Sequence, residues 1–329
     1  MKQVMYKKAA VASLIKSGKK LYLAADESML SQLPKGQWIG GTIPYFMAEQ
    51  GGKVSRDEIF VTELPKTVVD AKIVAYDDKS IASVYEDAYD NGFSLIVIPA
   101  TSPVHLSFAM NAAAYKQFAK VPLVGWITGM HLSDLGKVSA KVVDGQTGKI
   151  SSDRALVFHC KLAKGFYADV GIVNIFEQGD GDTITFSSSG WTTEKAFVNG
   201  KEVNFADYIK SKKLDIRLPL VADYTGTRIN ISFQSVEGKS GKVTFYAPFF
   251  EGVEYKQAKP IDNYVERFVT HMPKDKAEKI CFSCNCILNF LYSELEGKQT
   301  GHVVGPITFG EIVYQLLNQT LAYLTIEKE

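Results

Sequence analysis

Three cysteines lie close together in the last sixth of the chain, and thiols at this spacing can bind a metal or act as nucleophiles. The run reads Cys281-Phe-Ser-Cys284-Asn-Cys286. Zinc needs four donors in a tetrahedral array, and His302 could join the three thiols as the fourth. On a β-strand, however, Cys284 and Cys286 share one face while Cys281 takes the other. This alternation favours a buried strand in which cysteine serves as a small apolar residue, and we expect no bound metal.

Two other kinds of chemistry remain as alternatives. A thiol enzyme would use Cys284 as its nucleophile, and that nucleophile needs a base held in place by a third group. The histidines show no recognisable catalytic motif; they are His105, His131, His159, His271 and His302. A haem protein would need an iron ligand such as His131 or His159, and neither lies in a C-x-x-C-H attachment motif. The residues therefore favour a protein that is not an enzyme and has no cofactor, with haem kept as an alternative.

The cysteine run belongs to one of three stretches with a similar layout. Each stretch, at residues 20–46, 94–129 and 279–311, reads as a short apolar strand, a helix and a second strand that ends at glycine. An internal repeat and the ordinary recurrence of β-α-β units explain this loose similarity equally well.

The strand ends of these three stretches are the candidate ligand site, because open α/β sheets bind ligands outside the carboxyl ends of their strands. The residues expected there are Asp26, Gly40, Gly41, Thr42, Thr101, Ser102, Cys284, Asn285, Gly310 and Glu311. Glu311 would offer a carboxylate to an amine, Asn285 both a donor and an acceptor, and Gly310 a close approach to the backbone. Alternatively, Glu311 caps the start of a helix, and Gly40 and Gly41 form a tight exit from a strand.

The elements around these motifs indicate a mixed α/β fold with two intimately associated domains, residues 1–150 and 151–329. Apolar spacing predicts helices over residues 3–17, 80–89, 104–119 and 261–271, the last ended by Pro273, and strands over 95–98, 121–124 and 320–326. From residue 155 to about 250 the pattern has period two. Val198-Asn-Gly-Lys201 predicts a hairpin with a type I′ turn, and a second hairpin is expected around residues 237–241, with Ile229 and Ile231 in its first strand.

Composition excludes several classes of protein. The chain has 329 residues, is 46% hydrophobic and carries a net charge of +1, so a substantial core is expected and nucleic acid is not an expected partner. It has no apolar stretch of the length that a membrane span needs. Four cysteines, three of them in one short run, are not the pattern of a disulfide framework, and they favour a reducing, cytoplasmic location.

Several short motifs, taken together, resemble those of the FIST family of bacterial sensory domains. The segments that carry the resemblance are Ile39–Thr42, Ser189–Trp191, Ala196–Val203, Phe282–Cys284, Phe309–Ile312 and Asn318–Thr320. The chain departs from the family at Ile287, where members usually have arginine, so an anionic ligand would have to be held by other groups.

The resemblance implies a two-domain signal-input protein that binds a small molecule. Amino acids are the ligands suggested for the family, and a subgroup binds haem to sense nitric oxide. Such domains commonly occur near kinases and cyclic-nucleotide enzymes, so the expected output is a separate protein of that kind. Our leading hypothesis is thus a non-enzymatic small-ligand sensor; the alternatives are a haem-binding nitric oxide or redox sensor and a thiol-dependent enzyme using Cys284.

Overall fold

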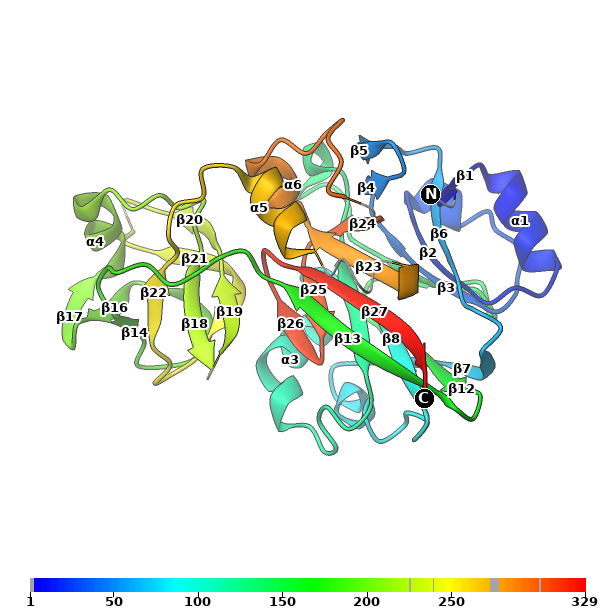
Figure 1. Cartoon of the computed structure of the whole chain (residues 1–329). Helices are drawn as coiled ribbons and strands as arrows, with labels where there is room; N and C mark the ends of the chain where they lie inside the picture. The colour runs from blue at the N-terminus through cyan, green and yellow to red at the C-terminus, as the bar shows by residue number, and fades with distance from the viewer. Residues whose placement is uncertain (1–2, 225, 239, 273–277, 302) are drawn as a thin grey trace.

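The computed structural model describes residues 3–224, 226–238, 240–272, 278–301 and 303–329. Within these ranges, strands dominate and the helices are short, so the mixed fold class is confirmed in a strand-rich form. Figure 1 shows a large body and a smaller lobe beside it. The smaller lobe is inserted into the body between strands β13 (Phe166–Val173) and β23 (Ile280–Cys286). No helix in the described part of the chain is long and apolar enough to cross a membrane.

The large body consists of three six-stranded sheets, and each is built on two parallel strands joined through a short helix. The strand pairs are β2 (Leu21–Ala25) with β3 (Trp38–Thr42), β8 (Gly92–Pro99) with β9 (Leu123–Thr128), and β23 with β24 (Gly305–Thr308). The helices between them are α2 (Glu27–Leu30), α3 (Pro103–Asn111) and α6 (Ile287–Tyr292). The three similar stretches of sequence therefore form three structural units of one kind.

Each unit sends a hairpin into the sheet of another unit. The hairpin of β4 (Tyr45–Ala48) and β5 (Gly51–Val54) follows β3 but pairs with β24. The hairpin of β10 (Val142–Asp144) and β11 (Lys149–Ser151) follows β9 but pairs with β3. The hairpin of β25 (Glu311–Val313) and β26 (Gln315–Leu317) follows β24 but pairs with β9. The exchange is cyclic, so it interlocks all three units.

The outer side of each sheet is formed by two further strands of the same unit. These are β1 (Met5–Tyr6) and β6 (Ile59–Glu63), β7 (Val68–Tyr76) and β12 (Ala155–Leu162), and β13 and β27 (Leu321–Lys328). The boundary expected at residue 150 lies at the end of the first sheet. Each of the other two sheets takes strands from both sides of that position.

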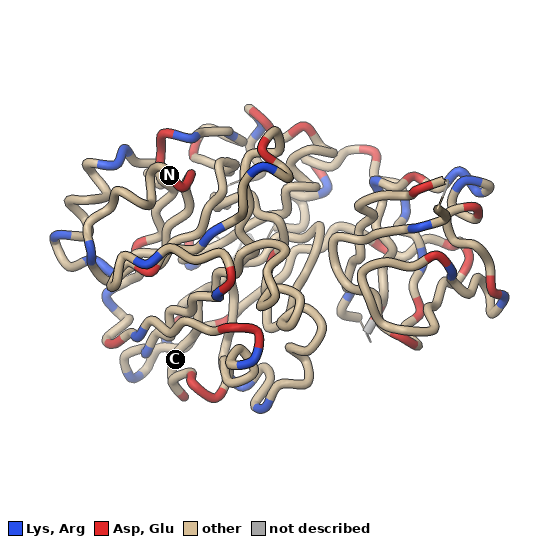
Figure 2. Tube along the Cα trace, turned by 180° about the vertical axis from the view of Figure 1, so that it is seen from behind, with Lys and Arg blue, Asp and Glu red and all other residues tan. Residues whose placement is uncertain are grey.

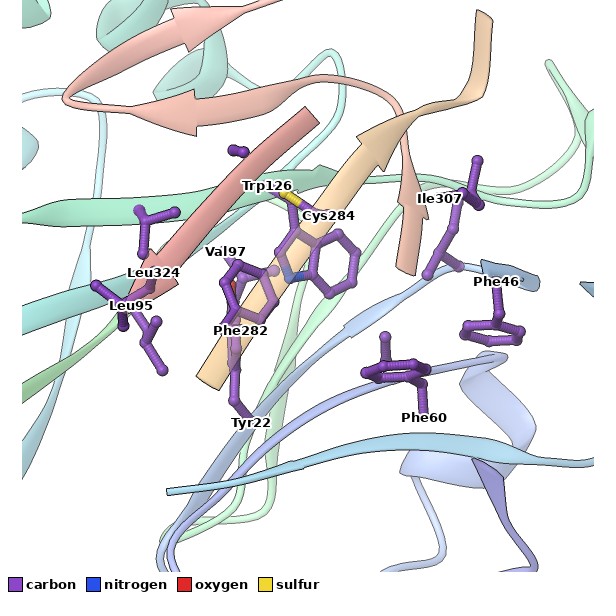
Figure 3. Packing of buried hydrophobic residues seen from close by; sticks show 14 of the residues in the cluster. Tyr22, Phe46, Phe60, Leu95, Val97, Trp126, Phe282, Cys284, Ile307 and Leu324 are labelled. Carbon is purple, nitrogen blue, oxygen red and sulfur yellow. The ribbon is translucent and has the colours of Figure 1, made fainter. Parts of the chain in front are cut away.

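The inner faces of the three sheets pack on one another and form a common core. Tyr22 of the first sheet, Trp126 of the second and Phe282 of the third meet there, with the Tyr22 ring centroid 6.3 Å from Trp126 and 5.0 Å from Phe282 (Figure 3). Close approach of the first two sheets requires Gly41, because a Cβ there would lie 2.5 Å from Thr128 Cγ2 and 2.7 Å from the Trp126 ring.

The smaller lobe is almost entirely β structure with an aromatic core. Its elements are β14 (Ile184–Thr185), β15 (Gly190–Thr193), β16 (Lys195–Val198), β17 (Lys201–Asn204), α4 (Phe205–Lys212), β18 (Leu220–Tyr224), β19 (Thr227–Ile231), β20 (Phe233–Val236), β21 (Val243–Phe249) and β22 (Tyr255–Gln257). Helix α5 (Tyr264–His271) then leads back to the body. The predicted hairpin at Asn199-Gly200 is confirmed, with φ of +49° and +80° at its two turn residues.

Several predicted elements differ in the structure. The helix expected over residues 80–89 is a short 3-10 turn, Ser80–Ser83, and the one expected over 104–119 ends at Asn111. Gln117 and Ala119 adopt left-handed φ angles of +60° and +58°, which a continuing helix cannot contain. The other two helices start later than expected: α1 spans Lys8–Lys16, and α5 starts at Tyr264. Ile229 and Ile231 lie on β19, which pairs with β18, whereas the second predicted hairpin is β20 with β21. Pro273 lies outside the described residues.

Candidate functional site

A buried carboxyl group is the centre of the polar cluster at the end of β24. Glu311 starts strand β25 and is fully buried. Its Oε1 lies 3.1 Å from Thr308 Oγ1, and its Oε2 accepts hydrogen bonds from the Thr320 backbone N–H and hydroxyl at 3.1 and 2.9 Å. Glu311 therefore starts a strand and does not cap a helix, and its carboxyl group contacts Thr308 and Thr320 inside the protein.

Burial favours the protonated form of Glu311. It raises the pKa of Glu311 to about 8, against the opposing hydrogen bonds that Thr320 and Thr308 donate to the carboxyl group. The Thr308 hydroxyl also lies near two backbone carbonyl oxygens, Asn285 O at 3.3 Å and Gly310 O at 3.1 Å.

The fold does not require a carboxyl group at this place. Glu311 is paired with Trp126 near the start of an exchanged strand. In the sheet of the third unit, the exchanged strand has apolar Phe46 at the same register, paired with Pro306 two residues before the end of β24, and Phe46 faces the core. One of the other sheets therefore folds with an apolar side chain at this position.

Cys284 and Cys286 of β23 lie close to Glu311 and are protonated thiols. Cys284 is buried and donates to Gly125 O at 3.3 Å, and Figure 3 shows it beside Trp126. Burial raises the pKa of both Cys284 and Cys286, and the nearby Glu311 raises each further. A thiolate nucleophile needs the opposite, an electropositive setting with a lowered pKa. These contacts give no support to the thiol-enzyme alternative.

Two asparagines extend the cluster towards the smaller lobe. The Asn285 amide oxygen accepts from the Cys286 backbone N–H at 2.8 Å, which fixes the orientation of the Asn285 amide. Asn289 donates through Nδ2 to that same oxygen at 2.8 Å and to Thr320 O at 3.3 Å. As a result, Asn285 Nδ2 and Asn289 Oδ1 are buried without a hydrogen-bond partner. Buried polar atoms are nearly always paired, so these two atoms are exceptions to the usual pattern.

Tyr264, at the first position of α5, brings a third unpaired atom to the same place. Its hydroxyl oxygen is buried and has no hydrogen-bond partner. Burial raises the pKa of Tyr264 well above its usual value of 10, with further contributions from the nearby Cys286 and Glu311. The phenol is therefore neutral, and it lies close to Asn285, Cys286 and Glu311.

A pocket of about 220 Å³ lies next to these side chains, at the junction of the body and the smaller lobe. Tyr264 and Asn289 line it, as does Gln319 from the turn between β26 and β27. The other lining residues are Phe176, Asp215, Arg217, Leu218, Pro260, Ile261, Tyr292 and Ser293. The pocket thus combines walls from both parts of the molecule with the polar cluster of the third unit.

The turn that carries Gln319 also joins the body to the smaller lobe. Ser232 of that lobe donates from its backbone N–H to Asn318 Oδ1 at 3.1 Å and from its hydroxyl to Gln319 Oε1 at 2.5 Å. Gln319 Nε2 donates to Arg217 O at 3.1 Å, and Asn230 Nδ2 donates to Asn318 O at 3.1 Å. All four of these hydrogen bonds cross the junction beside the pocket. A change in the turn that lines the pocket can therefore change how the lobe is held against the body.

The remaining candidate residues have structural roles. Gly40 and Gly41 allow close packing of β3, and the Thr42 hydroxyl donates to Gly129 O at 2.8 Å while accepting from the Lys141 N–H. The main chain of Gly310 packs beside Ile127 and Leu316, where a Cβ would come within 3.1 Å of each.

Two of the candidates cap helices. Asp26 Oδ1 accepts from Ser28 N at the start of α2, and Ser102 Oγ accepts from His105 N at the start of α3. Thr101 is exposed, has a φ of +60°, and donates its N–H to His105 Nδ1. Of the expected site, Cys284, Asn285, Gly310 and Glu311 lie together at the polar cluster, while Asp26, Thr101 and Ser102 cap or precede helices elsewhere.

The histidines considered for iron have other partners. His159 is buried and forms hydrogen bonds through both ring nitrogens, to Tyr76 Oη at 2.9 Å and to Ser94 Oγ at 2.7 Å. His131 stacks on Tyr45 and contacts Ser133 Oγ through Nδ1. These contacts do not fit His159 as a haem ligand. His302 lies outside the described residues, and among those described no group of three or more potential metal ligands converges.

Sequence reasoning missed the residues that line the pocket. Tyr264 belongs to a predicted helix, and Asn289 and Arg217 belong to no chemical motif. Gln319 lies in the Asn-Gln-Thr stretch, which places polar residues directly before the apolar strand β27 and could have indicated part of the pocket.

Comparison with known proteins gives one match that covers nearly the whole chain. A family of unknown function (DUF6976) matches residues 6–327. A search of curated proteins finds no significant match.

Proposed function

Because the chain belongs to DUF6976, a family of unknown function, its role has to be argued from its own residues, and we propose that it is a small-ligand-binding sensor protein. The ligand site in this proposal is the pocket between the body and the smaller lobe. The observation that carries the proposal is the pocket itself, whose walls come from both the body and the smaller lobe beside the turn that joins the two parts.

The position of the pocket supports a signalling role. Its walls come from α5 and α6, from the loop containing Asp215–Leu218 and from the turn containing Gln319, and hydrogen bonds join this turn to the smaller lobe. A ligand that contacts both sides favours the arrangement of lobe and body that it fits best. In the proposal, a separate output protein reads this arrangement. A kinase or a cyclic-nucleotide enzyme is the partner that the FIST resemblance implies.

The rest of the proposal concerns the setting in which the sensor acts. All four cysteines are free thiols, which suits a reducing compartment, and we place the protein in the cytoplasm on this basis. Figure 2 shows basic and acidic residues interspersed along the backbone of both parts, and with the net charge of +1 this gives no reason to propose nucleic acid as a partner.

A thermal-shift screen tests the proposal. The compounds are amino acids, nucleobases, nucleosides, nucleotides, simple amides and haem, each added to wild type and to Leu218→Trp, in which a large side chain fills the pocket. Leu106→Trp is the matched control, since Leu106 is 44% exposed on α3 and does not line the pocket.

We expect at least one compound to raise the melting temperature of wild type and of Leu106→Trp but not of Leu218→Trp. If every stabilising compound acts equally on Leu218→Trp, the site lies elsewhere. A Soret band or turnover of a stabilising compound would transfer support to the haem or the enzyme alternative.

A further inference from the structure

Strand β7 forms the outer edge of the second sheet. Its nine residues pair with β12 on one side, and no described strand pairs with it on the other. Figure 1 shows β7 and β12 at the end of the body that lies away from the smaller lobe. Of the six described strands that form the edges of the three body sheets, only β7 and β13 are longer than four residues. A long open edge offers unpaired backbone groups to another strand.

The direction of the backbone groups in β7 follows from the strand beside it. Leu162 N donates to Asn91 O at 2.9 Å, next to β8. Backbone groups alternate in direction along a strand, so the preceding residue, Lys161, turns its N–H and C=O groups towards β7, where it is paired with Asp70. On β7, Asp70 and every second residue after it therefore bond to β12. Ala71 and every second residue after it point their N–H and C=O groups away from β12.

Two charged side chains flank the outward groups of Ala71. The Ala71 N–H donates to Asp70 Oδ1 at 2.8 Å, which agrees with its direction away from β12. The other oxygen of Asp70 accepts from the Tyr89 hydroxyl at 3.0 Å, and Lys72 Nζ lies 5.3 Å from the centroid of the Tyr89 ring. Neither Asp70 nor Lys72 forms a salt bridge with another described residue. Both are exposed, so an ionic partner can reach each of them from outside.

The sequence around Ala71 is complementary to itself when it is read in the opposite direction. One neighbour is acidic and the other basic, and the next residues on the two sides, Val69 and Ile73, are β-branched. If two β7 strands pair antiparallel with Ala71 opposite Ala71, Asp70 of each lies opposite Lys72 of the other, and Val69 opposite Ile73. Val69 bulges out of the pairing with β12 and is 56% exposed, so it is accessible for this contact. Opposite charges and β-branched residues are both favourable cross-strand pairs.

We propose that the protein forms a two-fold symmetric dimer in which the β7 strands of two copies pair antiparallel, centred on Ala71. The pairing joins the second sheets of the two copies into one continuous sheet. The Ala71 N–H of each copy donates to the Ala71 C=O of the other, which releases the Asp70 carboxylate to contact Lys72 of the second copy. An interface made by one pair of strands is small, so we expect the dimer to be reversible.

The lysine on this edge does not prevent the pairing. Lysine on an edge strand usually keeps other strands away, because it meets no acid on them. In the two-fold arrangement each Lys72 meets an Asp70, because a contact made in one direction is repeated in the other. The edge is thus protected against strands of other sequence and open to a second copy of itself.

The other long edge lacks this complementarity. On β13, Val170 N donates to Asp169 Oδ1 at 2.9 Å, the same contact that Ala71 makes on β7. The residue after Val170 is Gly171, so pairing two β13 strands around Val170 would place glycine opposite Asp169. Strand β13 therefore has no base to match its acid, and it provides a control edge.

Sedimentation equilibrium of the full chain over a range of concentrations tests the dimer. We expect wild type to approach twice the 36.3 kDa mass of one chain as the concentration rises. Asp70→Lys and Lys72→Asp each place like charges opposite each other twice, and each should weaken dimerisation at least about tenfold. The double variant restores opposite charges and should dimerise within about threefold of wild type. Asp169→Lys makes the same charge change on β13 and should leave dimerisation unchanged.

Cysteine cross-linking tests the register. Paired residues that exchange both backbone hydrogen bonds have Cα atoms about 5.5 Å apart, which is within the range for a disulfide. Ala71→Cys should therefore form an intermolecular disulfide in oxidised glutathione. Ala75→Cys, on the same edge, should not, because the two-fold axis places its two copies more than about 20 Å apart. Wild type controls for the native thiols, of which Cys160, Cys284 and Cys286 are buried.

The results that would overturn the proposal are distinct. A wild type that stays monomeric at every concentration excludes the dimer. A dimer that both single charge variants leave intact, or that Asp169→Lys disrupts, has its interface elsewhere. A double variant as weak as the single variants means that Asp70 and Lys72 do not face each other. A dimer in which Ala71→Cys fails to cross-link, or Ala75→Cys cross-links equally well, has a different register.

Discussion

The substitution Glu311→Gln tests whether a buried neutral acid lies at the centre of the polar cluster. Glutamine has nearly the same shape as protonated glutamic acid and can keep contacts with Thr308 and Thr320, but it cannot ionise. In the folded protein the pKa of Glu311 is raised from 4.5 to about 8. The folded state thus holds one proton more than the unfolded state between these two values. The stability that Glu311 contributes is complete below pH 4.5 and is lost as the pH rises through 8.

The magnitude follows from the width of the pH window. One extra bound proton changes the free energy of unfolding by about 1.4 kcal/mol per pH unit. Between pH 6.5 and 8 the change flattens as the folded-state pKa is reached, which leaves a loss of roughly 1.5 kcal/mol in wild type. We choose this window because His105 and His159, whose pKa values are lowered to about 4, are neutral there in the folded state.

Urea unfolding at pH 6.5, 7, 7.5 and 8 is the assay, with wild type and Glu311→Gln measured side by side. We expect the difference in stability between the two proteins to shift by roughly 1.5 kcal/mol in favour of the glutamine variant across this range. Parallel pH profiles for the two proteins would refute the reasoning, because they would mean that Glu311 has the same pKa in the folded and the unfolded state.

Three further predictions concern the fold. On acidification from pH 6.5 to 4, wild type should lose roughly 3 kcal/mol of stability relative to His159→Gln, because burial lowers the pKa of His159 to about 4; parallel acid unfolding curves would contradict it. Gly41→Val should cost about 1–3 kcal/mol or more by overpacking against Thr128 and Trp126, whereas Gly181→Val, at a position with open space, should cost much less; equal urea midpoints would contradict it. Residues 1–150 expressed alone should show no cooperative unfolding transition, because β8 and β9 then lack their neighbours β12 and β25; dispersed amide spectra would contradict it.

The strands were predictable where the sequence carries a local signal. Leu95–Ile98 and most of β27 (Leu321–Lys328) are apolar runs. The Asn199-Gly200 turn needs positive φ angles, which this pair of residues adopts readily. The likeness of the three strand-helix-strand stretches was visible for the same reason. Helix lengths were overestimated because apolar spacing continues past Asn111, where α3 gives way to a short 3-10 turn, Ala112–Ala114.

The cyclic exchange of hairpins was not predictable from the sequence. Tyr45–Ala48 follows β3 directly, and no local feature shows that its partner is β24, some 260 residues later. Pairing over such distances is decided by the packing of whole sheets, which a single sequence does not display.

The candidate site was predictable in part. Cys284, Asn285 and Glu311 were expected together, and the structure brings them together. The complete burial of Glu311, which raises its pKa to about 8, could not be read from the sequence. The pocket itself is formed by residues from distant parts of the chain, such as Arg217, Tyr264 and Gln319, which only the three-dimensional fold brings together.

The most direct test of the central claim is a crystal structure of the protein grown with the compound that gives the largest pocket-dependent thermal shift. We predict density for that compound between Tyr264, Asn289 and Tyr292. Density for the compound at any other place, with this pocket filled only by solvent, would contradict the claim that the junction of the body and the smaller lobe is the ligand site.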